Sequence, residues 1–319
     1  MKNSTLNNLS VDIIDFDQVI KSAPLQLVEL PNNCNKVSIM VKREDLLHPI
    51  ISGNKWRKLK YNLIEAKKGG FNTLLTFGGA YSNHIHATSY AGKLFGFKTI
   101  GLIRGEEHLP LNPTLEYAKS QGMEIHYIDR TTYRRKREKS LLNLMRNKFG
   151  DFYLLPEGGS NRLAVKGCAE IIQDIDVEFD YILAACGTGG TLAGLIAGLD
   201  GKKEIIGIPV LKGANFLVSE IRSLVEEYSP KQYDNWRLQL DYHFGGYAKI
   251  NSELIGFMNK FELDNEILLD PVYTAKLMFA VNSMIGKGEF KEGSTVIAIH
   301  TGGIQGRKGM KNKVDKLLS

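Results

Sequence analysis

Short apolar runs alternate with longer segments of helical character from about residue 70 to about residue 300, and this alternation limits the possible folds more than any other feature. The run Tyr181–Cys186 is almost continuously apolar, which is typical of a strand covered on both faces. Strands that alternate with helices predict parallel sheets joined by right-handed crossovers. The sequence therefore predicts an α/β protein.

The predicted elements follow one another closely, and no Pro/Ser-rich linker separates them. Strands are expected at residues 73–77, 98–103, 123–128, 151–155, 181–186, 204–210 and 295–299. Helices are expected at residues 56–67, 82–95, 113–121, 162–175, 192–199 and 215–227, with Gly122 ending the third. A chain of 319 residues still predicts two lobes.

The composition excludes several classes of protein. Hydrophobic residues make up 43% of the chain and charged residues 24%, as in globular proteins. No apolar run approaches the roughly 18 residues that cross a bilayer, and the N-terminal stretch lacks the apolar core of a secretory signal. Cys34, Cys168 and Cys186 form neither a CxxC nor a zinc pattern, so a reducing, cytoplasmic compartment is expected. The formal charge of +6 suits an anionic small ligand.

The glycine-rich turns that follow strands are the candidate sites, because ligands of open α/β sheets bind beyond the carboxyl ends of the strands. The turn within Cys186–Gly194, CGTGGTLAG, leads from the apolar run into a helix. Backbone N–H groups at a helix start bind phosphate, and Thr188 and Thr191 add hydroxyl donors. No Gly-Lys-Ser/Thr follows, and Leu192 breaks the dinucleotide fingerprint. The turn predicts a site for a compact phosphate, with a plain strand-to-helix turn as the alternative.

Lys55 follows Gly53-Asn54 and stands at the start of a predicted helix. The helix dipole disfavours a charged ammonium there, and burial would lower its pKa further. Both effects favour the free amine that forms a Schiff base. Taken alone, a solvated surface lysine is the more common alternative.

Ser82, Asn83 and His84 are expected at the start of another helix, within GGAYSNHIHA. Their donors suit a carboxylate, and simple capping of the helix by Ser82 or Asn83 is the alternative. His84 and His86 have no third ligand nearby, so no metal site is predicted.

The segment 134–139, Arg-Arg-Lys-Arg-Glu-Lys, raises the alternative of a nucleic-acid-binding protein. It lacks interleaved aromatic residues and belongs to no known nucleic-acid module. The pattern favours a solvated helix face.

Six segments in chain order resemble the family of 1-aminocyclopropane-1-carboxylate (ACC) deaminases and D-cysteine desulfhydrases. They are KRED with SGNKWRKL (42–45 and 52–59), GGAYSNH (78–84), PEGGSN (156–161), GTGGT (187–191), DPVYTAK (270–276) and HTGG (300–303). The resemblance covers nearly the whole chain. It implies a pyridoxal-phosphate-dependent enzyme of the two-lobed, tryptophan-synthase-β-like fold (fold type II).

The resemblance also implies roles for individual residues. Lys55 would hold the cofactor as a Schiff base and later move protons at the substrate Cα. Asn83 would donate to the phenolic oxygen of the cofactor, and Ser82, together with His84, would hold the substrate carboxylate. The cofactor phosphate would lie on Gly187, Thr188, Gly189, Gly190 and Thr191.

Tyr247 and Tyr273 match the two active-site tyrosines of the family, Tyr247 being the weaker local match. Which of them acts in catalysis stays open, as does the role of Cys186. The large lobe would comprise residues 1–59 and 161–319, and the small lobe residues 60–160. A homodimer acting on a small amino acid is implied, with no nucleic-acid or membrane partner.

Thr274 and Thr301 bear on the reaction, because the ring nitrogen of the cofactor tunes its capacity to accept electrons. The ACC deaminases look like Tyr-Glu at residues 273–274, and a carboxylate there keeps the nitrogen protonated. Thr274 and Thr301 instead resemble the desulfhydrase pattern, in which a hydroxyl leaves the nitrogen neutral. That weaker electron sink suffices for β-elimination, since the departing thiolate removes the electrons.

The prediction is therefore α,β-elimination from D-cysteine to pyruvate, sulfide and ammonia. ACC deaminase activity is the near alternative, although opening a cyclopropane ring should need the stronger sink. Another amino-acid lyase or racemase on the same scaffold also stays open, because a fold does not fix a function.

Overall fold

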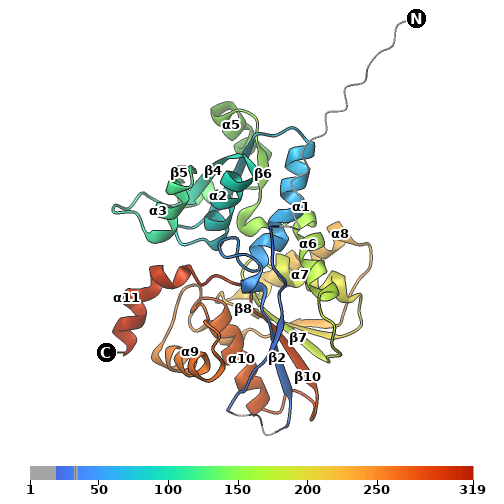
Figure 1. Ribbon diagram of the computed structural model, residues 1–319. Helices are drawn as coiled ribbons and strands as arrows, with labels where there is room; N and C mark the ends of the chain where they lie inside the picture. The colour runs from blue at the N-terminus through green and yellow to red at the C-terminus, as the bar shows by residue number, and fades with distance from the viewer. Residues whose placement is uncertain (1–18, 32, 34, 319) are drawn as a thin grey trace, which may run out of the picture.

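The computed structural model describes residues 19–31, 33 and 35–318, and the N-terminal stretch and Cys34 considered above lie outside these residues. Two sheets organise the described chain (Figure 1). The larger sheet has the strand order β1-β2-β10-β7-β8-β9, with β1 (Leu25–Leu27), β2 (Ser38–Lys42), β7 (Tyr181–Cys186), β8 (Glu204–Pro209), β9 (Trp236–Leu238) and β10 (Thr295–Ile299). The smaller sheet has the order β5-β4-β3-β6, with β3 (Thr73–Gly78), β4 (Lys98–Arg104), β5 (Glu124–Ile128) and β6 (Tyr153–Leu155).

The helices cover these sheets. They are α1 (Asn54–Lys68), α2 (Asn83–Phe95), α3 (Pro113–Ser120), α4 (Arg130–Arg134), α5 (Lys139–Phe149), α6 (Arg162–Gln173), α7 (Gly190–Leu199), α8 (Leu217–Tyr228), α9 (Ser252–Asn265), α10 (Thr274–Gly286) and α11 (Gly306–Leu318). Short 3₁₀ turns lie at Glu44–Leu46, Glu157–Gly159, Ala214–Phe216 and Asp241–His243. Within the described residues, no helix is both long and apolar enough to cross a membrane.

The α/β prediction is confirmed. All strand pairs are parallel except β1 with β2. All six residues of β7 are buried, as expected for a strand covered on both faces. Ser82 caps α2, and Gly122 follows the end of α3 in the left-handed region, with φ +90°.

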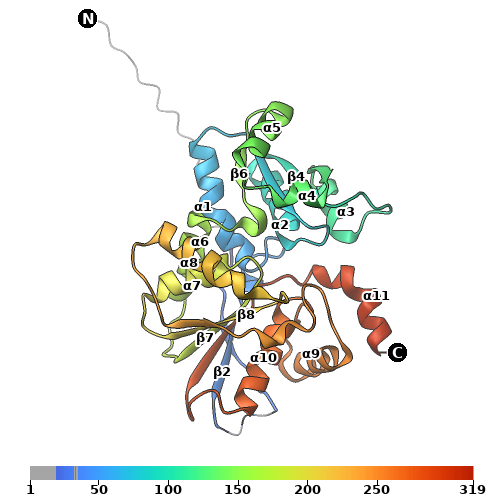
Figure 2. The ribbon, with the colours of Figure 1, turned by 180° about the vertical axis from the view of Figure 1, so that it is seen from behind.

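The two sheets lie in different parts of the molecule (Figures 1 and 2). The smaller sheet is built from residues 73–155, whereas the larger one combines strands that precede and follow this segment. Helix α1 runs between them, and Trp56 and Leu59 pack into the same cluster as Leu74 and Phe95. The predicted lobe boundary after residue 59 therefore falls within α1, and the lobe limits stay a prediction.

Three helices pack closely beneath the larger sheet's carboxyl edge because two glycines permit it. A Cβ at Gly167 of α6 would lie only 1.9 Å from the carbonyl oxygen of Arg57 on α1. A Cβ at Gly194 of α7 would lie 2.2 Å from the Cβ atom of Cys168 on α6. No side chain larger than hydrogen fits at either glycine, so α1, α6 and α7 form one tight stack.

Arg57 and Glu44 form a buried ion pair that fixes the start of α1. Arg57 Nε and Nη2 donate to the two carboxylate oxygens of Glu44 at 2.9 and 3.0 Å. Arg57 also contacts Asp174, which follows α6. The guanidinium is 4% exposed and the Glu44 side chain is fully buried. Removing one partner of such a buried pair strongly destabilises the fold, because the other charge stays buried and loses its main compensation.

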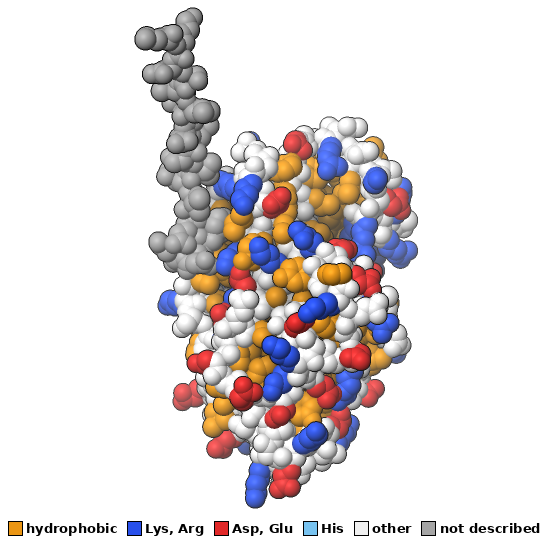
Figure 3. Space-filling view, turned by 90° about the vertical axis from the view of Figure 1, so that its right-hand side faces the viewer, with side chains coloured by type: hydrophobic (Ala, Val, Ile, Leu, Met, Phe, Trp, Pro, Cys, Tyr) orange, Lys and Arg blue, Asp and Glu red, His pale blue; other side chains and the backbone are white. Residues whose placement is uncertain are grey.

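The prediction of a solvated helix face at residues 134–139 is confirmed for the solvation, since all these residues but Lys136 are exposed, and wrong for the helix. Helix α4 ends at Arg134 and α5 begins at Lys139, so the run is the turn between two helices. Lys136 pairs with Glu157 at 3.1 Å, and Arg137 pairs with Glu220 of α8 at 2.7 Å. These carboxylates relieve the repulsion between adjacent cations. Side chains of a turn point in several directions and can therefore reach partners on different elements. The face in Figure 3 likewise shows cations and carboxylates interspersed.

Glu44→Gln is expected to lower the free energy of unfolding by about 3 kcal/mol, because it removes the fully buried partner of Arg57 and leaves only the more exposed Asp174 and Glu170. The measurement is the urea midpoint and slope of the parent and the variant. Arg137→Ala is the control, since its exposed pair should contribute less than about 1 kcal/mol. Equal losses in the two variants would contradict a special role for the buried pair.

Candidate active site

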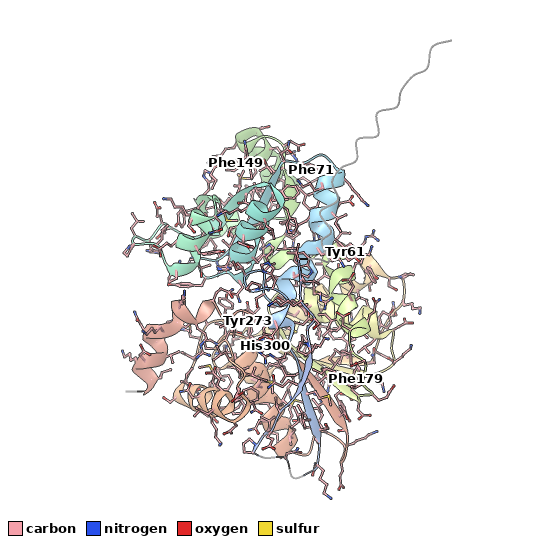
Figure 4. All side chains as sticks on the ribbon, in the orientation of Figure 1. Tyr61, Phe71, Phe149, Phe179, Tyr273 and His300 are labelled. Atoms are coloured by element: carbon pink, nitrogen blue, oxygen red, sulfur yellow. The ribbon has the colours of Figure 1, made fainter. Side chains whose placement is uncertain are left out.

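A cavity lies where the starts of α1, α2 and α7 converge with the turn after β10. Together with the solvent at its mouth, the empty space measures about 590 Å³. Figure 4 shows Tyr273 and His300 at the level of this cavity, between the two sheets. Of the residues predicted for the site, the wall includes Lys55, Ser82, Asn83, His84, Gly187, Thr188, Gly189, Thr191, Tyr247, Tyr273 and Thr301. Gly190 belongs to the same turn, whereas Thr274 does not line the cavity.

Gly53 brings Lys55 to the cavity. Its φ of +66° suits glycine, and a Cβ there would lie 2.0 Å from the carbonyl oxygen of Thr301. The N–H of Asn54 donates to that same oxygen at 3.3 Å. The turn before α1 therefore rests directly on the turn after β10, and Lys55 leaves this junction as the second residue of the helix.

Lys55 is a basic group held in poor contact with water. Burial, followed by the charge of nearby Lys58, lowers the pKa of Lys55 from 10.5 to about 7. Its Nζ donates to Oδ1 of Asn54 at 2.6 Å. A large fraction of the side chain is thus an uncharged amine near neutral pH, as a Schiff-base lysine requires.

The turn after β7 presents unfilled donors to the cavity. Helix α7 starts at Gly190, and no side chain caps it, so the first N–H groups have no partner within the helix. Thr191 Oγ1 accepts from Asn54 Nδ2 at 2.8 Å, and Thr188 Oγ1 lies 2.6 Å from Ser160 Oγ. Amide and hydroxyl donors converge here as a phosphate site needs.

Lys58 adds a cation that the sequence analysis did not single out. It is 4% exposed, and its Nζ donates to Gly158 O and Ser160 Oγ, both at 3.2 Å. Both partners are neutral, and burial lowers the pKa of Lys58. A bound phosphate would supply the missing negative charge. The available signal was its spacing, three residues after Lys55 on one helix face.

Ser82 and His84 have local partners of their own. Ser82 Oγ accepts from the N–H groups of His84 and Ile85 at 3.2 and 3.3 Å, so it caps α2 and lines the cavity at once. The hydroxyl of Thr76 donates to Leu155 O and therefore accepts from Nε2 of His84 at 2.9 Å. Burial, then Lys55 and Lys58, lowers the pKa of His84 well below 6.5. His84 is neutral and offers a carboxylate no charge.

Tyr247 and Tyr273 form one wall. Their rings meet edge to face, with centroids 6.1 Å apart. A Cβ at Gly187 would lie 3.3 Å from the Tyr273 hydroxyl, which places this hydroxyl beside the phosphate turn. Burial, then Tyr247, raises the pKa of Tyr273 well above 10, so it stays protonated. Lys276, fully buried, donates to the carbonyls of His243 and Gly246 at 2.8 Å each and so secures the loop before Tyr247.

Thr274 is directed away from the cavity. Its Oγ1 accepts from the Asp270 N–H at 2.7 Å and lies 3.0 Å from Asp270 Oδ2. Thr301 is the predicted ring-nitrogen hydroxyl that reaches the wall. Cys186 also lines the cavity, but burial raises the pKa of its thiol to about 12, so it is no nucleophile near neutral pH. Among the described residues, no cluster of three or more metal ligands exists.

Comparisons with known proteins agree with this geometry. The family model described as pyridoxal-phosphate dependent enzyme matches residues 17–302. A Thermotoga maritima protein named "Putative 1-aminocyclopropane-1-carboxylate deaminase" is 35% identical over 306 residues, which cover 91% of this chain and 96% of that protein. An Arabidopsis thaliana protein named "Bifunctional D-cysteine desulfhydrase/1-aminocyclopropane-1-carboxylate deaminase, mitochondrial" is 28% identical, covering 93% of this chain and 79% of that protein.

A solved structure described as an ACC deaminase homologue has a TM-score of 0.83 and 31% identity, covering 94% of both chains. The predicted family resemblance and the predicted fold are therefore confirmed.

Lys55→Met is expected to stabilise the cofactor-free protein by on the order of 4 kcal/mol at pH 7. The pKa of Lys55 is about 7 when folded and 10.5 when unfolded, so the unfolded state binds more protons between these values. The penalty is complete below pH 7 and fades as the pH rises toward 10.5. Urea unfolding at several pH values measures the difference.

Lys68→Met, at the exposed end of α1, is the control and should show no such pH-dependent gain. A constant difference between Lys55→Met and the parent from pH 6 to pH 10 would contradict the lowered pKa.

Proposed function

Because this chain belongs to the family of pyridoxal-phosphate-dependent enzymes, we propose that it catalyses α,β-elimination from a small D-amino acid, D-cysteine. One D-cysteine and one water would yield pyruvate, sulfide and ammonia. The observation that carries this proposal is the cavity wall itself. It combines a weakly basic lysine and a phosphate turn with hydroxyl groups, and among the described residues no carboxylate lines it.

The residues present fit the cofactor. The uncapped start of α7 and the hydroxyls of Thr188 and Thr191 suit its phosphate, and the buried Lys58 balances the charge. Lys55 would hold it covalently, and Asn83 would donate to its phenolic oxygen. When bound, pyridoxal phosphate withdraws electrons from the substrate Cα.

Lys55 moves the proton in this proposal. An amine with a pKa near 7 accepts a proton from Cα and returns to the free base at neutral pH. Ser82 holds the substrate carboxylate with its hydroxyl hydrogen, which the cap does not use, and the start of α2 adds the positive end of its dipole. His84, which is neutral, shapes this pocket without contributing charge.

Tyr273 is the group that we assign to the leaving sulfur. Its hydroxyl stays protonated at neutral pH and lies beside Gly187 on the wall. It can therefore donate a hydrogen bond to the sulfur as the C–S bond breaks and the sulfur leaves as hydrosulfide. Tyr247, 40% exposed and packed edge to face on Tyr273, positions the substrate at the outer side.

The absence of a wall carboxylate favours desulfhydration over ring opening. Thr301, rather than Thr274, is the hydroxyl available to the ring nitrogen, and Asp270 is occupied by N–H groups of residues 272–274. A neutral ring nitrogen suits a substrate with a good leaving group. ACC deaminase activity is the second candidate, and the name of the Thermotoga relative favours it, whereas the Arabidopsis relative is named for both activities.

The two-lobed division, a cytoplasmic location and a homodimer remain part of this proposal. The close pairing of Arg137 with Glu220 joins the predicted small lobe to α8 of the large one. The cavity would then lie between the lobes.

Pyruvate release from D-cysteine is the first expected result with the purified holoenzyme. L-cysteine and ACC are tested alongside, and 2-oxobutanoate is assayed as the product of ACC. Lys55→Ala is the inactive control. Release of 2-oxobutanoate from ACC with no pyruvate from D-cysteine would show that a wall without carboxylates does open the ring. Silence on D-cysteine would contradict the proposed substrate.

Tyr273→Phe is expected to lower kcat for D-cysteine by about 100-fold, the lower range for loss of one hydrogen-bond donor to a developing negative charge. With β-chloro-D-alanine the loss should be small, because chloride is a good leaving group and a weak hydrogen-bond acceptor. Tyr247→Phe is the matched variant and should affect KM more than kcat. Equal losses of Tyr273→Phe on both substrates would assign Tyr273 to positioning instead.

A further inference from the structure

The segment that follows β10 reaches from the larger sheet to the first turn of α2. After the turn at Thr301–Gly303, Gln305 Nε2 donates to Oδ1 of Asn83 at 2.8 Å. Helix α11 then continues between α3 and α9, as both ribbon views show (Figures 1 and 2). This hydrogen bond thus joins two distant segments at the cavity wall.

We infer that Gln305 is a positioning residue that fixes the orientation of the Asn83 amide, with the nitrogen left for the cofactor. An amide side chain has one accepting end and one donating end. Since Gln305 occupies Oδ1, Nδ2 is the end that remains for another group. The inference rests on the proposed contact of Asn83 with the phenolic oxygen of the cofactor, an acceptor that needs this donor.

The surrounding backbone restricts the amide further. Gly303 has a φ of +94°, and a Cβ there would lie 2.7 Å from Nδ2 of Asn83. A Cβ at Gly306 would lie 3.5 Å from Oδ1. The amide is therefore packed against glycine backbone on both ends. Within the described residues, its hydrogen bond to Gln305 is the one found for either end of the amide.

A reversed amide would have the opposite effect on the cofactor. Oδ1 would then face the phenolic oxygen, and two acceptors would meet in place of a donor and an acceptor. A donor draws electron density from the phenolic oxygen and weakens its hold on a shared proton. Loss of the donor should move the titration of the bound cofactor's visible band to higher pH.

Gln305→Met and Gln305→Glu separate orientation from packing. Methionine removes the donor at similar size, whereas glutamate presents acceptors only and draws Nδ2 of Asn83 toward itself. We expect the titration of the visible band to rise by roughly half a unit in Gln305→Met and further in Gln305→Glu. The cofactor dissociation constant should rise about 5- to 10-fold, the equivalent of one hydrogen bond.

Lys308→Met is the matched control, because Lys308 lies on α11 and lines the same outer groove as Gln305, but makes no hydrogen bond to Asn83 and does not line the cavity. In Lys308→Met, the titration of the visible band and the cofactor dissociation constant should equal those of the parent. Thermal unfolding of each holoenzyme checks that all variants are folded. Equal shifts in Gln305→Met and Gln305→Glu would overturn the inference, since lost packing affects both alike.

Asn83→Ala distinguishes this inference from the proposal beneath it. If Asn83→Ala shifts the titration and Gln305→Glu does not, the cofactor contact stands and the role of Gln305 falls. If Asn83→Ala leaves the spectrum unchanged, the proposed contact itself falls. The supporting result is a shift in both, with no added effect of Gln305→Glu in the Asn83→Ala background.

Discussion

The buried pair of Arg57 and Glu44 is the interaction on which the cavity depends. It holds the start of α1 against the turn after β2, and the contact of Arg57 with Asp174 extends it to the end of α6. Helix α6 in turn packs against α7, whose first residues form the phosphate turn. Lys55 and the turn after β7 come from segments more than 130 residues apart, and this ion pair and the hydrogen bond from Asn54 to Thr191 help to hold them together.

The electrostatics of the cavity follow from burial more than from charge count. Two lysines enter the wall and carboxylates stay outside it, so the site favours anions at two points, the phosphate turn and the start of α2. Removal from water also keeps Lys55 only weakly basic and His84 neutral. The same burial thus gives Lys55 the weak basicity that the proposed proton transfer needs and leaves His84 without charge.

The alternation of apolar and helical segments predicted the central strands and the turns that meet at the cavity, because parallel strands end at one edge. Strand β2 and the helices α9 to α11 were not predicted, because they lie outside the alternating pattern: β2 precedes it, α9 and α10 follow each other with no strand between, and α11 comes after the last strand. Lys58 was not singled out, because the sequence contains many lysines. Thr274 does not line the cavity, and its hydroxyl is hydrogen-bonded to Asp270 four residues away, a local contact that the sequence does not reveal.

Helix α10 has a consequence for substrate range. Tyr273 immediately precedes α10, and the buried Lys276 of this helix donates hydrogen bonds to carbonyls of the loop that leads to Tyr247. The rings of Tyr247 and Tyr273 come from separate parts of the chain, yet both are held in place by helix α10. A bulkier amino acid therefore cannot be accommodated by relaxing a loop alone. Widening this wall would require the helix to move, and both tyrosines would move with it.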